Sequence, residues 1–248
     1  MSTADLHCEY DIRAGDCVDI LNDLDRVHCI FADPPDNLGL KYDEYDDCVS
    51  SSHYEVRLES WVDTFIGKAG ITWISFNSRW LPAMGRIAEN LLDRFKFTLE
   101  LKTCVQTFTF GQHNHHDLGN CYRPLWRFRW ANAPLYPDAI RVPSWRQQNG
   151  DKRADPRGRV PGDVFDFPRV TGNSKQRRKW HPTQLHEDLV ERCIKLSTKE
   201  GDHVIDPFAG TGTTLRVCKR MNRSCMLIDI SPEYCFQIGR DNLDVNWN

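Results

Sequence analysis

Short apolar stretches alternate along this chain with stretches whose apolar residues recur every three or four positions. The short stretches are rich in β-branched and aromatic residues, and they predict strands at 27–32, 70–76, 95–105, 125–130, 203–205 and 225–230. The second pattern predicts helices at 80–92, 184–197 and 213–221, and a last helix that begins at Pro232. Because strands and helices alternate, the predicted fold class is α/β, with a mostly parallel sheet that helices cover on both faces.

Residues 132–179 interrupt this alternation. Pro, Gly, Arg and Asp dominate there, and only short apolar pieces such as residues 164–167 occur. This composition is typical of a loop-rich insert rather than of a core segment. We therefore expect one domain in two halves, residues 1–131 and 181–248, separated by a basic insert at 132–180.

The bulk composition limits the class of protein. The 248 residues suffice for one well-buried α/β domain with an inserted lobe. A net charge of −3 does not by itself indicate a nucleic-acid partner, but residues 141–179 hold eleven Lys and Arg against four Asp. Ten cysteines without a Cys-x-x-Cys spacing or a secretory leader indicate a reducing compartment. No apolar run approaches the ~18 residues of a membrane span, so we expect a cytoplasmic protein.

The segment 206–214, which we call the glycine loop, reads Asp-Pro-Phe-Ala-Gly-Thr-Gly-Thr-Thr and joins the strand at 203–205 to a predicted helix. Such a junction presents backbone N–H groups and a helix N-terminus to a small ligand. A P-loop would need Lys where Thr213 stands, and a dinucleotide site would need a third glycine where Leu215 stands. A methyl-donor site fits better, because Asp229 ends the next strand and can accept from ribose hydroxyls. Taken alone, the loop is equally compatible with a tight turn that binds nothing.

A second motif, Asp33-Pro34-Pro35, ends the predicted strand at 27–32. An exocyclic amine of a nucleobase is a poor nucleophile, because its lone pair is delocalised into the ring. Two acceptors that hold both N–H bonds favour a pyramidal nitrogen, and the Asp33 carboxylate and the Pro34 carbonyl could supply them in directions that the prolines fix. A free aspartate, with a pKa of ~3.9, is too weak a base to deprotonate the amine first, so its role would be orientation and charge stabilisation. In isolation, the motif is also typical of a plain turn.

Together, the two motifs and their flanking residues resemble the β class of DNA amino-methyltransferases, which use S-adenosylmethionine to modify adenine N6 or cytosine N4. The resemblance rests on residues 14–21, 30–42, 181–184, 206–214 and 229–234. It implies a permuted Rossmann-like methyltransferase fold in which the catalytic motif precedes the cofactor loop. It also implies that the target base is flipped out of the duplex before transfer.

The resemblance assigns a role to each matched position. The residues implied to contact S-adenosylmethionine are Asp16 and Cys17 near its adenine, Asp229 at its ribose, Thr183 and Gln184 near its methionine end, and Asp206, Phe208, Gly210, Gly212 and Thr213 along the glycine loop. The residues implied to hold the target amine are Asp33, Pro34, Pro35 and Asp36.

Asp36 departs from the family pattern, in which this position is an aromatic residue that stacks on the flipped base. A carboxylate cannot stack there, and it adds negative charge beside Asp33. Tyr42, Tyr45 or an aromatic residue from another loop could stack instead, or Asp36 could contact the base edge. Three functions stay open: an adenine-N6 methyltransferase, which Asp rather than Ser before the prolines favours, a cytosine-N4 methyltransferase, and a catalytically impaired subunit that binds cofactor and DNA. An NAD-type oxidoreductase would leave the Asp-Pro-Pro motif unexplained.

The basic insert suits contact with double-stranded DNA, the partner that the resemblance implies. Its cations, interleaved with Trp145 and Trp180, can bind phosphates, although a solvated charged loop would have the same composition. The residues that we expect at the DNA are Arg146, Arg153, Lys175, Arg177, Arg178 and Lys179. A homodimer and a cognate restriction enzyme are further partners that the family suggests. No complete zinc pattern is formed by His113, His115, His116 and Cys121, so we expect no metal.

Overall fold

The computed structural model describes residues 8–108, 115–172 and 174–243, and its centre is one eight-stranded sheet. The strand order is β1-β8-β7-β2-β3-β5-β4-β6. The strands are β1 (Tyr10–Ala14), β2 (Val27–Ala32), β3 (Ala69–Ser75), β4 (Leu99–Thr107), β5 (Tyr122–Trp130), β6 (Val164–Asp166), β7 (His203–Asp206) and β8 (Ser224–Asp229). β5 pairs antiparallel with β3 and β4, and the other pairings are parallel, which confirms the predicted mostly parallel sheet.

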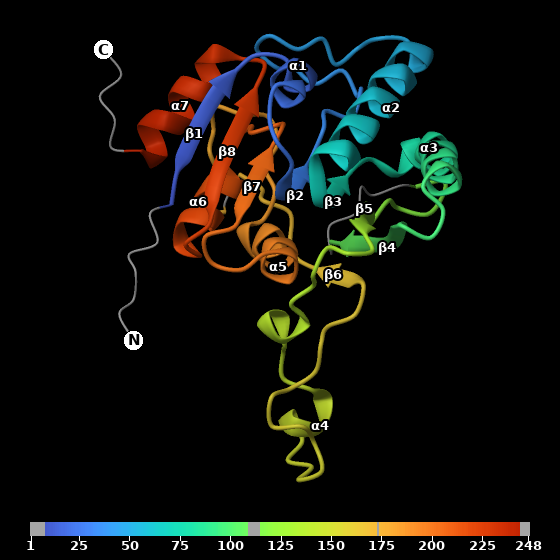
Figure 1. Cartoon of the computed structure of the whole chain (residues 1–248), viewed down its shortest axis with the longest axis vertical. Coiled ribbons are helices and arrows are strands. Elements are labelled where there is room, and N and C mark those ends of the chain that lie inside the picture. The colour runs from blue at the N-terminus through green and yellow to red at the C-terminus, as the bar shows by residue number, and fades with distance from the viewer. Residues whose placement is uncertain (1–7, 109–114, 173, 244–248) are drawn as a thin grey trace.

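Helices cover both faces of this sheet, as predicted (Figure 1). One face packs against α1 (Cys17–Asn22), α2 (Ser51–Lys68) and α3 (Leu81–Arg94). The other packs against α5 (Glu187–Ser197), α6 (Thr213–Arg220) and α7 (Pro232–Asn242). Successive side chains of a strand point to opposite faces, so Ile30 of β2 belongs to the first core and Phe31 to the second.

Most predicted elements are present with ends that differ by a few residues; the strand predicted at 125–130 begins at Tyr122, and the helix predicted at 184–197 begins at Glu187. Val27–Ala32 is a strand as predicted, and the last helix begins at Pro232. The prediction of a strand at residues 95–98 was wrong, because β4 begins only at Leu99. Phe97 has a left-handed backbone with a φ of 64°, and its fully exposed side chain contributes nothing to the core.

In the N-terminal half, the sequence patterns did not predict β1, α1, α2 or the 3₁₀ helix η1 (Ser78–Trp80). α2 buries Tyr54, Leu58, Trp61 and Phe65, which recur every three or four residues along one face. Acidic and polar residues separate these apolar positions, and they conceal a helical signal that is present in the sequence.

Residues 131–163 leave the sheet after β5 and form an arm that extends away from it (Figure 1). The arm contains the 3₁₀ helix η2 (Pro137–Ile140) and the short helix α4 (Trp145–Gln148). Within the predicted loop-rich insert, residues 164–166 of the apolar piece form β6, which extends the sheet beside β4. Phe165 is buried, and its ring centroid lies 6.0 Å from that of Trp73.

The carboxyl ends of β1, β8, β7 and β2 meet at one edge of the sheet, because these four strands are adjacent and parallel. Asp16 follows β1 closely, and Asp33 follows β2. Asp206 and Asp229 are the last residues of β7 and β8. Ligands of open α/β sheets bind outside this edge, so the fold gathers these carboxylates where a ligand is expected.

Candidate active site

A cavity of about 410 Å³ lies at this edge of the sheet. The predicted cofactor residues that line it are Asp16, Cys17, Thr183, Gln184, Asp206, Phe208, Gly210, Thr213 and Asp229. Asp33 and Pro35 line the same cavity, so the structure brings both sequence motifs to one space. The lining formed by the described residues does not include Gly212, Pro34 or Asp36.

Two glycines give the glycine loop its shape. Gly210 and Gly212 have φ angles of 49° and 71°, in the left-handed region that favours glycine. A Cβ atom at Gly212 would also lie 2.8 Å from Cγ2 of Ile238 on α7. Gly212 therefore serves the turn and the packing of α7 rather than the cavity wall.

The carboxylates at the ends of β7 and β8 hold the glycine loop. Asp206 accepts the backbone N–H of Phe208 at 3.0 Å and the hydroxyl of Thr214 at 2.5 Å. Asp229 accepts the backbone N–H of Gly210 at 2.9 Å. A carboxylate has about four acceptor positions, so both groups can still accept hydrogen bonds from a ligand in the cavity.

Burial shifts the ionisation of both carboxyl groups. It raises the pKa of Asp206 to about 7, although the hydrogen bonds from Thr214 and Phe208 oppose the rise. Burial also raises the pKa of Asp229 to about 6, against the backbone N–H groups of Ser231 and Gly210. A ligand whose hydroxyl groups donate hydrogen bonds to these two carboxyl groups would stabilise their charged forms, and it would so favour their ionisation near neutral pH.

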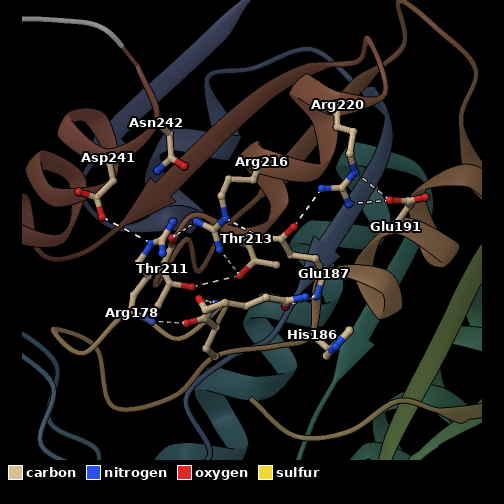
Figure 2. Close-up of polar contacts among 12 residues, drawn as sticks. Arg178, His186, Glu187, Glu191, Thr211, Thr213, Arg216, Arg220, Asp241 and Asn242 are labelled. Carbon is tan, nitrogen blue, oxygen red and sulfur yellow. Dashed lines mark hydrogen bonds and ion pairs between the residues drawn. The ribbon is translucent and has the colours of Figure 1, made fainter. Parts of the chain in front are cut away.

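Side chains of α5 and α6 hold the glycine loop through a chain of polar contacts, as Figure 2 shows. Arg216 on α6 donates from Nη1 to the carbonyl oxygen of Thr211 at 2.7 Å and from Nη2 to Oγ1 of Thr213 at 3.1 Å. Its Nε donates to Glu187 at 2.8 Å, and Glu187 also accepts from Arg220 at 2.9 Å. Sequence reasoning did not identify Arg216, which ties the glycine loop to the start of α5.

Residues 181–184 form another wall of the cavity. Burial lowers the pKa of His181 to about 4, so its imidazole is neutral at pH 7, and Nδ1 lies 2.7 Å from the carbonyl oxygen of Thr183. Gln184 donates to the carbonyl of Gln176 at 2.6 Å and accepts the backbone N–H of Arg178 at 2.8 Å. Gln184 thus lines the cavity and also fixes the segment before it.

An arginine from β5 pairs with both aspartates of the Asp-Pro-Pro motif. Arg123 donates from Nη2 to Oδ1 of Asp33 at 2.7 Å and from Nη1 to Oδ2 of Asp36 at 2.5 Å. Asp36 therefore faces Arg123 and not the cavity. Sequence reasoning missed Arg123, because the strand predicted at 125–130 stops short of it and Pro124 favours a strand boundary.

Aromatic side chains line the cavity beyond Asp33. The ring centroid of Tyr42 lies 5.6 Å from that of His181 and 6.2 Å from that of Tyr45. Burial raises the pKa of Tyr42, and the nearby charge of Asp33 contributes to the rise. Both tyrosines considered for base stacking are thus in the cavity wall.

The segment between the Asp-Pro-Pro motif and α2 is held on two sides. Asp47 is buried and accepts the backbone N–H groups of Asn37 at 2.7 Å and Leu40 at 3.0 Å. The hydroxyl of Ser231 donates to Asp43 at 2.6 Å. These contacts join the segment to the end of β8 and so place Tyr42 and Tyr45 over the cavity.

The predicted DNA contacts fall into an exposed and a half-buried group. The exposed residues are Arg146, Arg153, Lys175 and Lys179, of which the first two lie in the arm. Arg177 and Arg178 are half-buried. Arg177 donates to the carbonyl of His181 at 2.6 Å, and Arg178 lies 3.6 Å from the carboxylate of Asp241.

Two further features concern metals and membranes. Within residues 8–108, 115–172 and 174–243, no three His, Cys, Asp or Glu side chains gather closely enough to hold a metal ion. His113 lies outside these residues. None of the helices described for this chain is both long enough and apolar enough to cross a membrane.

The chain is similar to known proteins over most of its length. The profile of the DNA methylase family matches residues 27–240. The chain is 32% identical to Type II methyltransferase M.HpaI of Haemophilus parainfluenzae over 227 residues, which are 90% of this chain and 69% of that protein. It is 31% identical to DNA adenine methyltransferase YhdJ of Escherichia coli (strain K12), over 89% of this chain and 77% of that protein.

Solved structures share the fold. PvuII DNA methyltransferase, described as cytosine-N4-specific, matches with a TM-score of 0.72 at 16% identity, over 97% of this chain and 88% of that one. M1.HpyAVI in complex with SAM matches with a TM-score of 0.65 at 20% identity, over 95% of this chain and 100% of that one. At these identities the likeness shows the fold alone, and it confirms the predicted Rossmann-like methyltransferase architecture.

Proposed function

Because the chain belongs to the DNA methylase family, we propose that it transfers a methyl group from S-adenosylmethionine to the N6 amine of adenine in DNA. Membership of this family shows the broader activity, which is that of a DNA amino-methyltransferase of the N6/N4 type. The choice of adenine and the roles of individual residues are our proposal, and the chemistry of the site supports them.

One observation carries the proposal: Asp33 and Pro35 share a cavity with the glycine loop and Asp229. Methyl transfer needs a donor site and an acceptor site within reach of each other, since placement of the reacting groups supplies much of the rate. The parallel pairing of β2 with β7 brings both motifs to one edge of the sheet, and there Asp33 and Pro35 form part of the cavity wall itself.

The lining suits S-adenosylmethionine by size and by chemistry. A volume of about 410 Å³ is in the range of small-molecule sites. Asp229 lines the cavity and can accept from ribose hydroxyls. The residues that the resemblance assigns to the adenine, Asp16 and Cys17, and to the methionine end, Thr183 and Gln184, line the same cavity. When bound, S-adenosylmethionine supplies a methyl group on a positively charged sulfur.

In the proposed reaction, Asp33 orients the amine of a flipped base. Its carboxylate accepts one N–H bond, and the carbonyl of Pro34, which stands between the lining residues Asp33 and Pro35, accepts the other when the base enters. The nitrogen lone pair would then point into the cavity. The charge that develops on the nitrogen is stabilised by the Asp33 carboxylate. Deprotonation before transfer is not required of Asp33, because the nitrogen loses its surplus proton to solvent after the N–C bond has formed.

Adenine is favoured over cytosine by two observations. The motif begins with Asp33 rather than with Ser, and the similar protein YhdJ is a DNA adenine methyltransferase. The cytosine-N4-specific PvuII enzyme resembles this chain in fold at only 16% identity. Methylation of cytosine N4 is therefore the alternative that an experiment must exclude.

We further propose that the arm binds DNA phosphates through its exposed cations. Arg146 and Arg153 belong to the arm, and Lys175 and Lys179 lie in the sequence between the arm and the cavity residues at 181–184. Phosphate contacts of this kind orient a protein on the duplex without reading its sequence. A second copy of the chain and a cognate restriction enzyme are further partners that we propose on the family relation alone.

The product of the reaction tests the proposal. Purified protein is incubated with isotope-labelled S-adenosylmethionine and unmethylated DNA, and the digested nucleosides are identified by mass spectrometry. Label in N6-methyladenine is the expected result. Label in N4-methylcytosine would contradict the choice of base, and measurable cofactor binding without label in DNA would contradict the enzyme and favour a recognition subunit.

A further inference from the structure

The guanidinium of Arg123 connects the ends of three strands at the edge of the sheet. β5 runs antiparallel to β3, so its first residues lie beside the carboxyl end of β3. From there Nε of Arg123 donates to the hydroxyl of Ser75 at 2.6 Å, and Nη2 donates to Asp33 at 2.7 Å. The antiparallel strand therefore brings a cation to the end of β2, where the catalytic motif begins.

Asp36 is fixed on the side of this cation by several donors. Its Oδ1 accepts the backbone N–H of Asn77 at 2.8 Å and Nη2 of Arg123 at 3.2 Å. Nε1 of Trp80 donates to its backbone carbonyl at 2.7 Å. Only 12% of the Asp36 side chain and 18% of the Arg123 side chain are exposed. These contacts hold Asp36 outside the cavity lining, on the side of Arg123.

We propose that Arg123 is a positioning residue for methyl transfer, and that Asp36 anchors its guanidinium so that one fork holds the Asp33 carboxylate ionised and correctly oriented. This proposal rests on the proposed role of Asp33 as the acceptor for the amine. It explains the unusual Asp36 as half of an ion pair, and it removes the reason to regard the chain as catalytically impaired.

The charges around Asp33 determine the direction in which each substitution should shift its pKa. Burial raises the pKa of Asp33, Arg123 lowers it, and Asp36 raises it. Tyr42 and Asp206 are the other titratable groups that interact with Asp33. Removing Arg123 should therefore raise the pKa of Asp33, whereas neutralising Asp36 should lower it. Damage to the fold alone would not produce opposite shifts.

The planar shape of the Arg123 guanidinium leads to an expectation for the Arg123→Lys variant. Lys would keep the positive charge but could not bridge two carboxylates as the planar guanidinium does. Arg123→Lys should therefore keep the pH dependence close to that of the wild type while orienting Asp33 less well.

The test compares Arg123→Met, Arg123→Lys and Asp36→Asn with Arg129→Met as the matched control. Arg129 is on the same strand and pairs with Glu100 away from the cavity. Single-turnover transfer to DNA is measured against pH at saturating S-adenosylmethionine, and cofactor affinity is measured separately over the same pH range, since Asp206 and Asp229 also titrate there.

The expected rate loss is roughly 100-fold for Arg123→Met and roughly tenfold for Arg123→Lys, with cofactor affinity little changed. The acid limb of the rate profile should move to higher pH in Arg123→Met and to lower pH in Asp36→Asn, and Arg129→Met should match the wild type. Equal losses in all variants without a shift of the acid limb would overturn the positioning role.

A second measurement does not depend on turnover. The pKa of the Asp33 carboxyl is followed by carbon-13 NMR, with its signal assigned from the spectrum of Asp33→Asn. A higher pKa in Arg123→Met and a lower pKa in Asp36→Asn are expected. An unchanged pKa in both variants would overturn the inference, whether or not the wild-type protein methylates adenine.

Discussion

Arg216 on α6 reaches back over the glycine loop and donates to the carbonyl oxygen of Thr211 at 2.7 Å. Its guanidinium is held in place by Glu187 at the start of α5, at 2.8 Å. Thr211 is buried, so its backbone carbonyl needs a hydrogen-bond donor from within the protein. The pair Arg216 and Glu187 provides that support, and it lies outside the cavity.

Arg216→Met should weaken S-adenosylmethionine binding roughly 10- to 100-fold, the range for loss of hydrogen bonds to a charged group. Arg220→Met is the matched control, because Arg220 is on the same helix and pairs with the same Glu187 at 2.9 Å without contacting the loop. Isothermal titration calorimetry with both folded variants makes the comparison. Equal weakening by both substitutions would show that Arg216 has no particular role in the loop.

The pKa of Asp206 predicts a pH dependence of stability. Its ordinary value is 3.8 and burial raises it to about 7, so the folded protein keeps this proton to a higher pH than the unfolded chain does. The stabilising contribution of this group is fully present below about pH 4 and is lost as the pH rises to about 7. Asp206→Asn imitates the protonated form and should not lose it.

Urea unfolding of the ligand-free wild type and of Asp206→Asn measures this difference. From pH 4 to pH 8, the free energy of unfolding of the variant should rise relative to that of the wild type by on the order of a few kcal/mol. The same pH dependence in both proteins would mean that Asp206 is not the buried, proton-retaining group that its surroundings indicate.

The arm predicts a salt-dependent contribution to DNA binding. Arg146→Ala combined with Arg153→Ala should weaken binding to all sequences alike, because phosphate contacts carry no base information. The slope of log affinity against log salt should become less steep by about 0.9 for each lost contact. Arg86→Ala on α3, an exposed member of a surface ion pair, is the control and should bind DNA normally. An unchanged slope in the double variant would place the DNA elsewhere on the molecule.

Local signals allowed the sequence to predict much of the sheet and of the cavity. The strand at Val27–Ala32 has its predicted bounds, since two prolines follow it closely, and the start of the last helix is marked by Pro232. The family resemblance, which the match of residues 27–240 confirms, linked motifs that lie far apart in the sequence. The structure places these motifs around one cavity. Such motifs were predictable because each is a short run of consecutive residues that can be recognised without knowing its contacts in space.

The residues that support the site were not predictable in the same way. Arg123 contacts Asp36 across 87 positions of the chain, and the contact depends on the antiparallel pairing of β5 with β3. Arg216 meets Glu187 only because α5 and α6 pack side by side. α2 differs from both, because its buried residues Tyr54, Leu58 and Trp61 have helical spacing that the acidic residues around them concealed.

The Asp33→Ala variant tests whether the site that holds the target amine and the site that holds the cofactor have separate roles. If Asp33 orients the amine while the glycine loop holds the cofactor, the variant should transfer methyl groups to DNA at least roughly 100-fold more slowly and bind S-adenosylmethionine with nearly the wild-type affinity. Single-turnover transfer and calorimetric binding on the same folded sample measure both quantities. Transfer at the wild-type rate, or loss of cofactor binding in the folded variant, would contradict this division of roles.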